Sequence, residues 1–331
     1  MNTSDLNKLR DVVDSTKITT YMSCPRKYLY RHVLHWEVDQ SSIHLSFGQA
    51  WHLAMEHMLL GINRGESYID SVHEAKRMFR DHLSQEYPNN SHPIKNIENG
   101  ENALDVYSRL FEADLDRYEV LFTEVPGVVN IPSHTKDYNY FYKIDAIVRD
   151  REDGLIYVID HKTAQQDSEA FRAQWRLSPQ VCAYTHMLYS MYDWDEIGGV
   201  VINAAFIRKA SLDFDRIPTD IGPNHMNRWL TMIYRWVALL DEDYESISTI
   251  SGSCGVLSSF VPNWTNCTKY GLCPYYDLCI SWNNPLQEEK PVGYKYQPWD
   301  PREHSAVKEE KKDANTEQET GGDTEALPGD K

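Results

Sequence analysis

Two aspartates and a lysine stand near the ends of two consecutive predicted strands. Asp145 lies in the first strand, and Asp160 and Lys162 lie near the end of the second. Because side chains alternate along a strand, Asp160 and Lys162 share one face. Carboxylates about 4 Å apart repel by about 4 kcal/mol at an effective dielectric near 20, so converging aspartates call for a cation. Mg²⁺ or Mn²⁺, which prefer carboxylate oxygens, would suit this site.

A metal ion and a lysine at one sheet edge suit phosphodiester hydrolysis. The metal polarises the phosphate and lowers the pKa of a bound water, while the ammonium stabilises charge in the transition state. The Asp-x-Lys spacing is weak by itself, because such a pair at a strand end is more often a surface ion pair. Other motifs must decide between the two interpretations.

Three cysteines, Cys267, Cys273 and Cys279, lie within thirteen residues in the pattern C-x5-C-x5-C. A tetrahedral zinc site or an iron-sulfur cube needs a fourth ligand, and Cys24 and Cys254 are the candidates. In a reducing compartment these thiols indicate metal binding rather than disulfides. The remaining cysteine, at position 182, falls inside a predicted helix and is expected in the core.

The elements that position these residues follow from hydrophobic periodicity. Helices are predicted from about Thr19 to Trp36 and over residues 47–62, 66–86 and 101–120. Alternation then predicts three consecutive strands over 119–129, 138–148 and 155–163, with the turn 151–154 joining the last two as a hairpin. A helix opening at Ser178 and Pro179, a buried strand over 197–207 and a helix over 225–240 complete the pattern. The order is βββαβ, so we predict an α/β fold with a mixed central sheet flanked by helices.

The charge of the chain argues against simple nucleic-acid binding. With 33 basic and 50 acidic residues, the net charge is -17, whereas polyanions are held mainly by Lys and Arg. Locally the picture differs, because residues 16–36 contain four basic residues and no acid. The candidates for contact with phosphates and bases are Arg26, Lys27, Tyr28 and Arg31. A plain solvated helix face explains the same residues equally well.

The sequence contains no long apolar run. A membrane span needs roughly 18 consecutive apolar residues, and the first ten residues lack the apolar centre of a signal peptide. We therefore expect a cytoplasmic protein with no membrane contact.

The motifs occur in an order that resembles the RecB-like exonucleases of the PD-(D/E)XK nuclease superfamily. Between about Thr16 and Cys279 the sequence reads SCPRKYLY, GQAWH, KIDAI, VIDHKT and QVCAY, followed by the terminal cysteines. The resemblance implies a metal-dependent DNA nuclease that acts on single strands or duplex ends in repair, recombination or genome processing. It also implies a possible protein partner in such a complex, and it leaves the oligomeric state undetermined.

The resemblance assigns a role to each candidate site residue. The implied ligands of Mg²⁺ or Mn²⁺ are His52, Asp145, Asp160 and the carbonyl of His161. Lys162 would be the catalytic lysine. Gln180 and Tyr184, four residues apart on one helix face, would hold the scissile phosphate or this lysine. Without the resemblance, the histidine on the helix and this pair would be ordinary surface or packing residues.

Three neighbours of these residues leave alternatives open. Glu56 could complete a metal pair on the helix of His52. Glu124 could assist the site or lie at a solvated strand end. Lys143 stands where many relatives have glycine, so the strand geometry beside Asp145 is undetermined.

For the cysteines, the resemblance favours Cys24 over Cys254 as the fourth ligand and a 4Fe-4S cluster over zinc. Many relatives have the spacing C-x2-C-x5-C, and the longer first gap here keeps zinc as an alternative. Such a centre would hold the N-terminal helix against the C-terminal segment.

Four regions follow from this interpretation. They are an N-terminal helical region over 1–118, a nuclease core over 119–245, a cysteine-cluster segment over 246–285 and a disordered acidic tail over 286–331. Two other classes compete with the nuclease: a non-catalytic DNA-binding adaptor that retains the fold, and a zinc-stapled interaction protein without a nucleic-acid role. A retired site would have no chemical need for the full residue set, which favours the enzyme.

Overall fold

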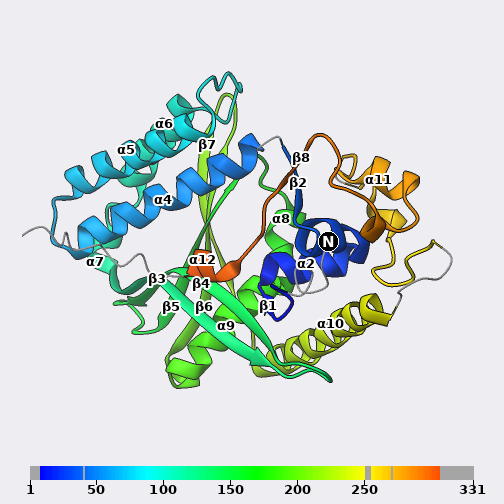
Figure 1. Ribbon diagram of the computed structural model, residues 1–331. Coiled ribbons are helices and arrows are strands. Elements are labelled where there is room, and N and C mark those ends of the chain that lie inside the picture. Colours follow the sequence, from blue (N-terminus) through cyan, green and yellow to red (C-terminus); the bar gives the residue numbers. More distant parts are fainter. Residues whose placement is uncertain (1–7, 40–41, 250–254, 270, 306–331) are drawn as a thin grey trace, which may run out of the picture.

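The computed structural model describes residues 8–39, 42–249, 255–269 and 271–305. A mixed six-stranded sheet forms its centre (Figure 1), with the order β1-β4-β5-β6-β7 and with β3 along the other edge of β4. The strands of this sheet are β1 (Val12–Val13), β3 (Tyr118–Ile131), β4 (Tyr138–Asp150), β5 (Ile156–Ala164), β6 (Ile197–Ile207) and β7 (Leu212–Thr219). β5 and β6 are parallel, whereas β3, β4 and β5 form an antiparallel meander.

Helices cover both faces of the sheet. The longer helices are α2 (Ser15–Ser23), α4 (Ile43–Asn63), α5 (Tyr68–Glu86), α6 (Ile97–Leu110), α9 (Pro179–Met191) and α10 (Pro223–Thr249). One buried cluster joins the sheet to α2, α9 and α10, and a second joins the end of β6 to α4, α5 and α6. These two groups of helices lie apart in Figure 1. The predicted βββαβ core is thus confirmed as β3, β4, β5, α9 and β6.

Short elements complete the described part of the chain. They are α3 (Pro25–Tyr28), a π-turn (Leu29–Val33), α7 (Asp114–Arg117), α8 (Glu169–Ala173), α11 (Tyr276–Ser281) and α12 (Pro301–Ser305), with 3-10 turns at Gln174–Leu177, Trp194–Glu196, Trp264–Asn266 and Pro285–Gln287. β2 (Trp36–Val38) pairs with β8 (Tyr294–Tyr296) in a separate small sheet. No helix of the described ranges is long and apolar enough to cross a membrane.

The N-terminal helix differs from its prediction at both ends. α2 begins at Ser15, because Asp14 is extended and its side chain accepts a hydrogen bond from the Lys17 N–H at 2.7 Å. The helix stops at Cys24, which is also extended. A residue before proline is driven out of the helical region, so Pro25 ends α2 and opens α3. This break turns Cys24 out of the regular helix.

The predicted disorder of the acidic tail is wrong for its first part, residues 286–305, which the structure describes. Residues 294–296 pair with 36–38 as a strand, and the Trp299 indole nitrogen donates to Asp14 at 2.9 Å. The segment therefore packs against the N-terminal elements as far as Trp299, and α12 after it lies against β4 and β3. The rest of the predicted tail, 306–331, lies outside the described residues.

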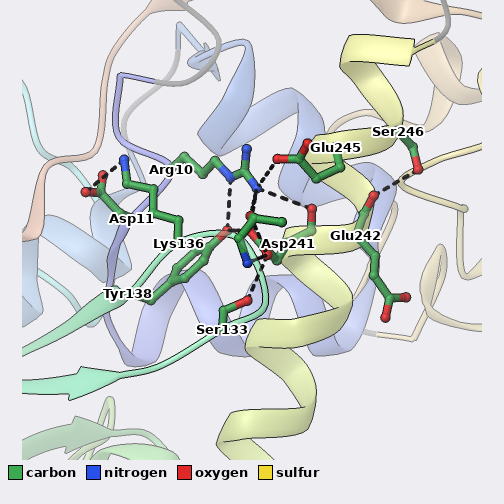
Figure 2. A network of polar contacts seen from close by, with 10 residues as sticks. Arg10, Asp11, Ser133, Lys136, Tyr138, Asp241, Glu242, Glu245 and Ser246 are labelled. Carbon is green, nitrogen blue, oxygen red and sulfur yellow. Dashed lines mark hydrogen bonds and ion pairs between the residues drawn. The ribbon is translucent and has the colours of Figure 1, made fainter.

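A buried polar network connects the N-terminal segment to α10 and to the β3–β4 connection (Figure 2). Arg10 forms ion pairs with Asp241, where the side chain is 2% exposed, and with Glu245 on α10. The same carboxylate accepts hydrogen bonds from the hydroxyls of Ser133 at 2.8 Å and Tyr138 at 3.1 Å. One buried acid thus links the N-terminal segment, the β3–β4 connection and α10.

Candidate functional site

The site lies where β4 and β5 separate. Their antiparallel pairing ends at Ala146 and Ile159, so the next residues in register are Asp145 and Asp160. Beyond this point β5 continues beside β6, and β4 continues beside β3. Side chains at such a fork have space that the paired part of the hairpin lacks, and the two predicted carboxylates meet there.

Three further groups contact these aspartates. His52 Nδ1, from α4, lies 3.0 Å from Asp145 Oδ2, and the His161 N–H donates to the same oxygen at 2.9 Å. Lys162 Nζ lies 2.6 Å from Asp160 Oδ2. The helix and the two strands therefore bring together the histidine, the aspartates and the lysine that the sequence predicted as one site.

The two carboxylates have opposite electrostatic environments. Burial raises the pKa of Asp160, and the nearby Asp145 charge adds to this, although Lys162 opposes it. For Asp145, burial also acts to raise the pKa, but His52 and then His161 and Lys162 outweigh it and leave the pKa lowered. A divalent cation would relieve the cost of burying Asp160 beside a second negative charge.

The donor set fits Mg²⁺ or Mn²⁺. Asp160 is 1% exposed, and its Oδ1 has no hydrogen-bond partner among the described residues. A buried, unpartnered carboxylate oxygen beside a second carboxylate is the kind of group that a hard cation satisfies. As the side chains stand, no three His, Cys, Asp or Glu groups in the described ranges surround a common point. A metal would therefore replace some of the present contacts, such as that between His52 and Asp145.

Gln180 and Tyr184 connect α9 to the strand that carries Asp145. Gln180 Nε2 donates to the Tyr184 hydroxyl at 2.7 Å, and this hydroxyl donates to the carbonyl of Lys143 at 2.8 Å. Tyr184 is 2% exposed, so it acts on the backbone of β4 rather than on solvent. The predicted spacing of four residues places both groups together, with Gln180 on the open side.

Glu124 and Lys143, whose roles the sequence leaves open, form an ion pair with each other. Glu124 lies between Thr123 and Val125, which pair with Ala146 and Ile144, and therefore opposite Asp145. Its φ is +53°, which is uncommon for a residue other than glycine. A strained residue opposite a candidate ligand is typical of functional sites.

Two residues that lie next to the site could not be recognised from the sequence. The Trp175 ring lies 5.7 Å from Lys162 Nζ, and Asn203 on β6 contacts the His161 ring at 3.0 Å. Neither belongs to a motif, and only the parallel pairing of β5 with β6 brings Asn203 to this position. The histidine ring faces away from the two catalytic candidates on either side of it, and its carbonyl remains a predicted metal contact.

A hydroxyl-rich groove, here called the α2 groove, lies between α2 and the start of α9. Its middle, of about 370 Å³, is lined by Ser15, Thr16, Thr19, Thr20, Ser23, Lys27, Ser178, Pro179 and Gln180. One neighbouring cavity shares Gln180 with it and continues to Lys143 and Tyr184. Another shares Lys27 and continues to Cys24 and Cys267. These cavities thus follow one another from the cysteines to Gln180, Tyr184 and Lys143.

In the basic stretch of residues 26–31, most side chains contact other parts of the protein instead of an open surface. Arg26 is buried and donates to the carbonyls of Phe260 at 3.0 Å and Leu257 at 3.2 Å. Tyr28 is 0% exposed, so it has no face for a base. Both side chains belong to the core in this structure, which leaves no exposed surface for the predicted nucleic-acid contacts of Arg26 and Tyr28. Arg31 donates to the Gln297 carbonyl at 2.7 Å, which leaves Lys27 as the member that lines the α2 groove.

The predicted cysteines gather at the far end of this groove. Cys24, Cys267 and Cys273 line one cavity of about 440 Å³, and Cys279 interacts electrostatically with Cys24 and Cys273. Burial raises the pKa of the Cys279 thiol to about 11. All four are free thiols. The rival ligand, at position 254, lies outside the described residues, and Cys182 is a core residue at 1% exposure, as predicted.

Residues 15–279 match the family model of the PD-(D/E)XK nuclease superfamily. Among solved structures, a Eubacterium rectale protein provisionally named an exonuclease is 14% identical, with a TM-score of 0.48 over 87% of this chain and 92% of that one. The protein SSO0001 is 16% identical, with a TM-score of 0.31 over 73% and 78% of the two chains. No curated protein matches the sequence.

Proposed function

Because the chain belongs to the PD-(D/E)XK nuclease superfamily, we propose that it hydrolyses DNA phosphodiester bonds with Mg²⁺ or Mn²⁺, as an exonuclease of the RecB-like type. The observation that carries the proposal is the buried carboxylate of Asp160, whose Oδ1 has no partner among the described residues. It lies beside Asp145 and Lys162 where two strands separate. A structural surface ion pair would have no reason to bury this oxygen.

Each residue has a distinct role in this reaction. Asp145, Asp160 and His52 would hold the metal, which when bound supplies Lewis acidity and a water of lowered pKa. Lys162 donates hydrogen bonds to the phosphate oxygens as negative charge builds up on them. Gln180 lies in the first turn of α9. Its side-chain amide and the N-terminus of this helix would both contact the same phosphate. Tyr184 is a positioning residue, because it fixes the β4 backbone next to Asp145.

Action from a strand end is tested with circular DNA. An exonuclease needs a free end, so linear single strands and duplex ends should be degraded in Mn²⁺ while covalently closed single-stranded circles persist. Linear DNA labelled at the 5′ or the 3′ end reports the polarity through its product ladder. Cleavage of circles as fast as of linear strands would show an endonuclease and reject this part of the proposal.

We also propose that the α2 groove carries the DNA strand to the site. Threonine and serine hydroxyls can bond to phosphates and sugars, and Lys27 supplies a cation near the middle of the path. Such a groove gives nucleic-acid contact in spite of the acidic total, since only local charge meets the strand.

Replacing Lys27 with alanine should weaken single-strand binding and its salt dependence. Loss of one phosphate contact lowers the slope of log affinity against log salt by about 0.7 for single strands. Fluorescence anisotropy with a labelled oligonucleotide at several salt concentrations, without metal, measures both quantities. Lys76→Ala, which removes a lysine paired with Asp105 on the helices away from the groove, is the matched control. An unchanged slope in Lys27→Ala would remove Lys27 from the path.

We propose in addition that Cys24, Cys267, Cys273 and Cys279 hold a 4Fe-4S cluster, with zinc as the alternative. Support comes from the shared cavity and from the break at Pro25, which brings Cys24 to the C-terminal cysteines. As the side chains stand, no three of these thiols form a metal site in the described ranges, so a bound cluster or ion would have to draw them together.

Metal analysis of anaerobically purified protein tests the cysteine centre. We expect about four irons per chain with visible absorbance, and loss of both in Cys24→Ser. Cys182→Ala should retain the metal, because Cys182 lies in the α9 core. One zinc per chain would select the alternative, and no metal in the unaltered protein would reject the centre.

A further inference from the structure

A pocket of about 290 Å³ lies between α4 and the face of the sheet opposite to Lys162. Most of its wall is aliphatic or aromatic, and includes Leu59, Tyr107, Phe111, Tyr118 and Ile159. Its size is close to the lower end of the roughly 300–1,000 Å³ typical of small-molecule sites. None of the roles described above uses this pocket.

The His161 side chain lines the pocket, because alternation turns it away from Asp160 and Lys162. Its Nδ1 lies 3.0 Å from Asn203 Nδ2, and the same amide nitrogen donates to the Tyr107 hydroxyl at 2.7 Å. Which ring nitrogen carries the proton depends on the tautomer, because the Asn203 Oδ1 is also buried without a partner among the described residues. His161 Nε2 is buried and likewise has no partner in these ranges. His161 thus offers one buried hydrogen-bonding nitrogen within the pocket wall.

A hydrogen-bond donor in the same pocket wall belongs to Arg216 on β7. Its terminal nitrogens pair with the carboxylate of Asp114, with a distance of 2.8 Å from Nη1 to Oδ1, and its guanidinium lies 4.2 Å from the centre of the Phe111 ring. These contacts fix the guanidinium plane and use its two outer nitrogens. The remaining Nε–H is buried and, in the part of the chain that the structure describes, has no partner.

The pocket therefore combines the Arg216 donor and the His161 nitrogen with mainly apolar walls, beside the polar side chains of Asn63, Asp114, Glu119 and Arg151. Buried polar groups are nearly always hydrogen-bonded, so the complementary occupant offers an acceptor to Arg216 and a hydrogen-bonding group to His161. The aromatic walls favour a planar ring system. A nucleobase, which carries carbonyl oxygens and ring nitrogens on a flat heterocycle, meets both requirements.

The position of the pocket connects it to the candidate active site. Leu59 lies two helical turns after His52 on the same face of α4. The His52 and His161 rings are 6.4 Å apart. The pocket therefore lies beside the helix that supplies His52, on the face of β5 opposite to Asp160 and Lys162.

We propose that this pocket binds a nucleobase, from the strand that is being cleaved or from a free nucleotide. Only the first source rests on the proposed nuclease function. A base bound to His161 and Arg216 would also hold β5 and β7 in place from the face opposite to the carboxylates. It would thereby help to hold Asp160 and Lys162, which flank His161 in the sequence.

The first test measures binding of the four deoxynucleoside 5′-monophosphates to the metal-free full chain by saturation-transfer NMR and calorimetry. Leu59 is a partly exposed lining residue of α4, so a tryptophan at this position should fill the pocket. Leu59→Trp should therefore weaken nucleotide binding by about tenfold or more, an effect about the size of losing one buried hydrogen bond. Ile62→Trp blocks the pocket from the next turn and serves if the first variant misfolds. Leu60→Trp, on the same helix but outside the lining, is the matched control.

The second test uses single-stranded oligonucleotides with one abasic residue at successive positions, again without metal. If the pocket takes a base of the bound strand, one abasic position should lower affinity for the unaltered protein and for Leu60→Trp but not for Leu59→Trp. If it takes a free nucleotide, the abasic series should be flat and the monophosphates should bind.

The proposal is overturned if neither the monophosphates nor the abasic series distinguishes Leu59→Trp from Leu60→Trp. The pocket would then contain only water. That result leaves the nuclease proposal standing, because DNA cleavage by the unaltered protein is measured separately. Conversely, monophosphate binding that Leu59→Trp abolishes supports the pocket even if no DNA is cut.

Discussion

Replacing Lys162 with alanine is expected to lower the rate of DNA cleavage by about 10²–10³-fold, the usual cost of removing one donor that stabilises transition-state charge. The ammonium group lies 2.6 Å from Asp160 and 5.7 Å from the centre of the Trp175 ring. These neighbours hold it at the carboxylate site, where its side chain is 19% exposed. Steady-state cleavage of end-labelled DNA in Mn²⁺ gives the ratio of rates.

The control for this substitution is Lys76→Ala, which removes a lysine that is paired with Asp105 away from the site. Its cleavage rate should stay close to that of the unaltered protein. DNA binding without metal should be similar in both variants, since Lys162 acts in the transition state. Equal cleavage by Lys162→Ala and Lys76→Ala would remove Lys162 from the reaction.

Replacing Asp241 with alanine is expected to destabilise the protein by about 3–5 kcal/mol, the cost of removing one partner from a buried ion pair. The substitution leaves Arg10 buried, with its Glu245 contact at a half-exposed carboxylate. It also removes the acceptor for the hydroxyls of Ser133 and Thr135, which bond to it at 2.8 and 2.7 Å. Denaturant unfolding, followed by tryptophan fluorescence, measures the difference in the free energy of unfolding.

The neighbouring substitution Glu242→Ala separates this network from the general effect of an altered α10. Glu242 is exposed, so its replacement should change the stability by no more than about 0.5 kcal/mol. A loss of stability that is equal in Asp241→Ala and Glu242→Ala would contradict the role assigned to the buried carboxylate.

The order of the core elements could be predicted because apolar residues alternate in β4 and form a continuous buried run in β6. Alternation in β4 and β5 and the proline at the start of α9 define the hairpin and the helix, and with them the positions of Asp145, Asp160 and Gln180. A reader of the sequence cannot see that β4 and β5 separate at the aspartates. That geometry depends on β6 taking over the pairing of β5.

Other errors have equally physical causes. β7 was not predicted because charged residues interrupt its apolar alternation. One of them, Arg216, does not face solvent but pairs with Asp114. Around Tyr28, apolar and basic residues are buried on all sides, so the pattern did not reveal which face contacts solvent. The buried donor at Arg26 depends on carbonyls from a segment more than two hundred residues away.

The central claim is that the site of Asp145 and Asp160 takes a divalent metal and cuts DNA with it. Incubation of the anaerobically purified full chain with end-labelled single- and double-stranded DNA, in Mn²⁺, Mg²⁺ or EDTA, tests this directly. We predict cleavage with Mn²⁺ or Mg²⁺ and none in EDTA. Absence of cleavage with either metal, or cleavage that persists undiminished in EDTA, would contradict the account.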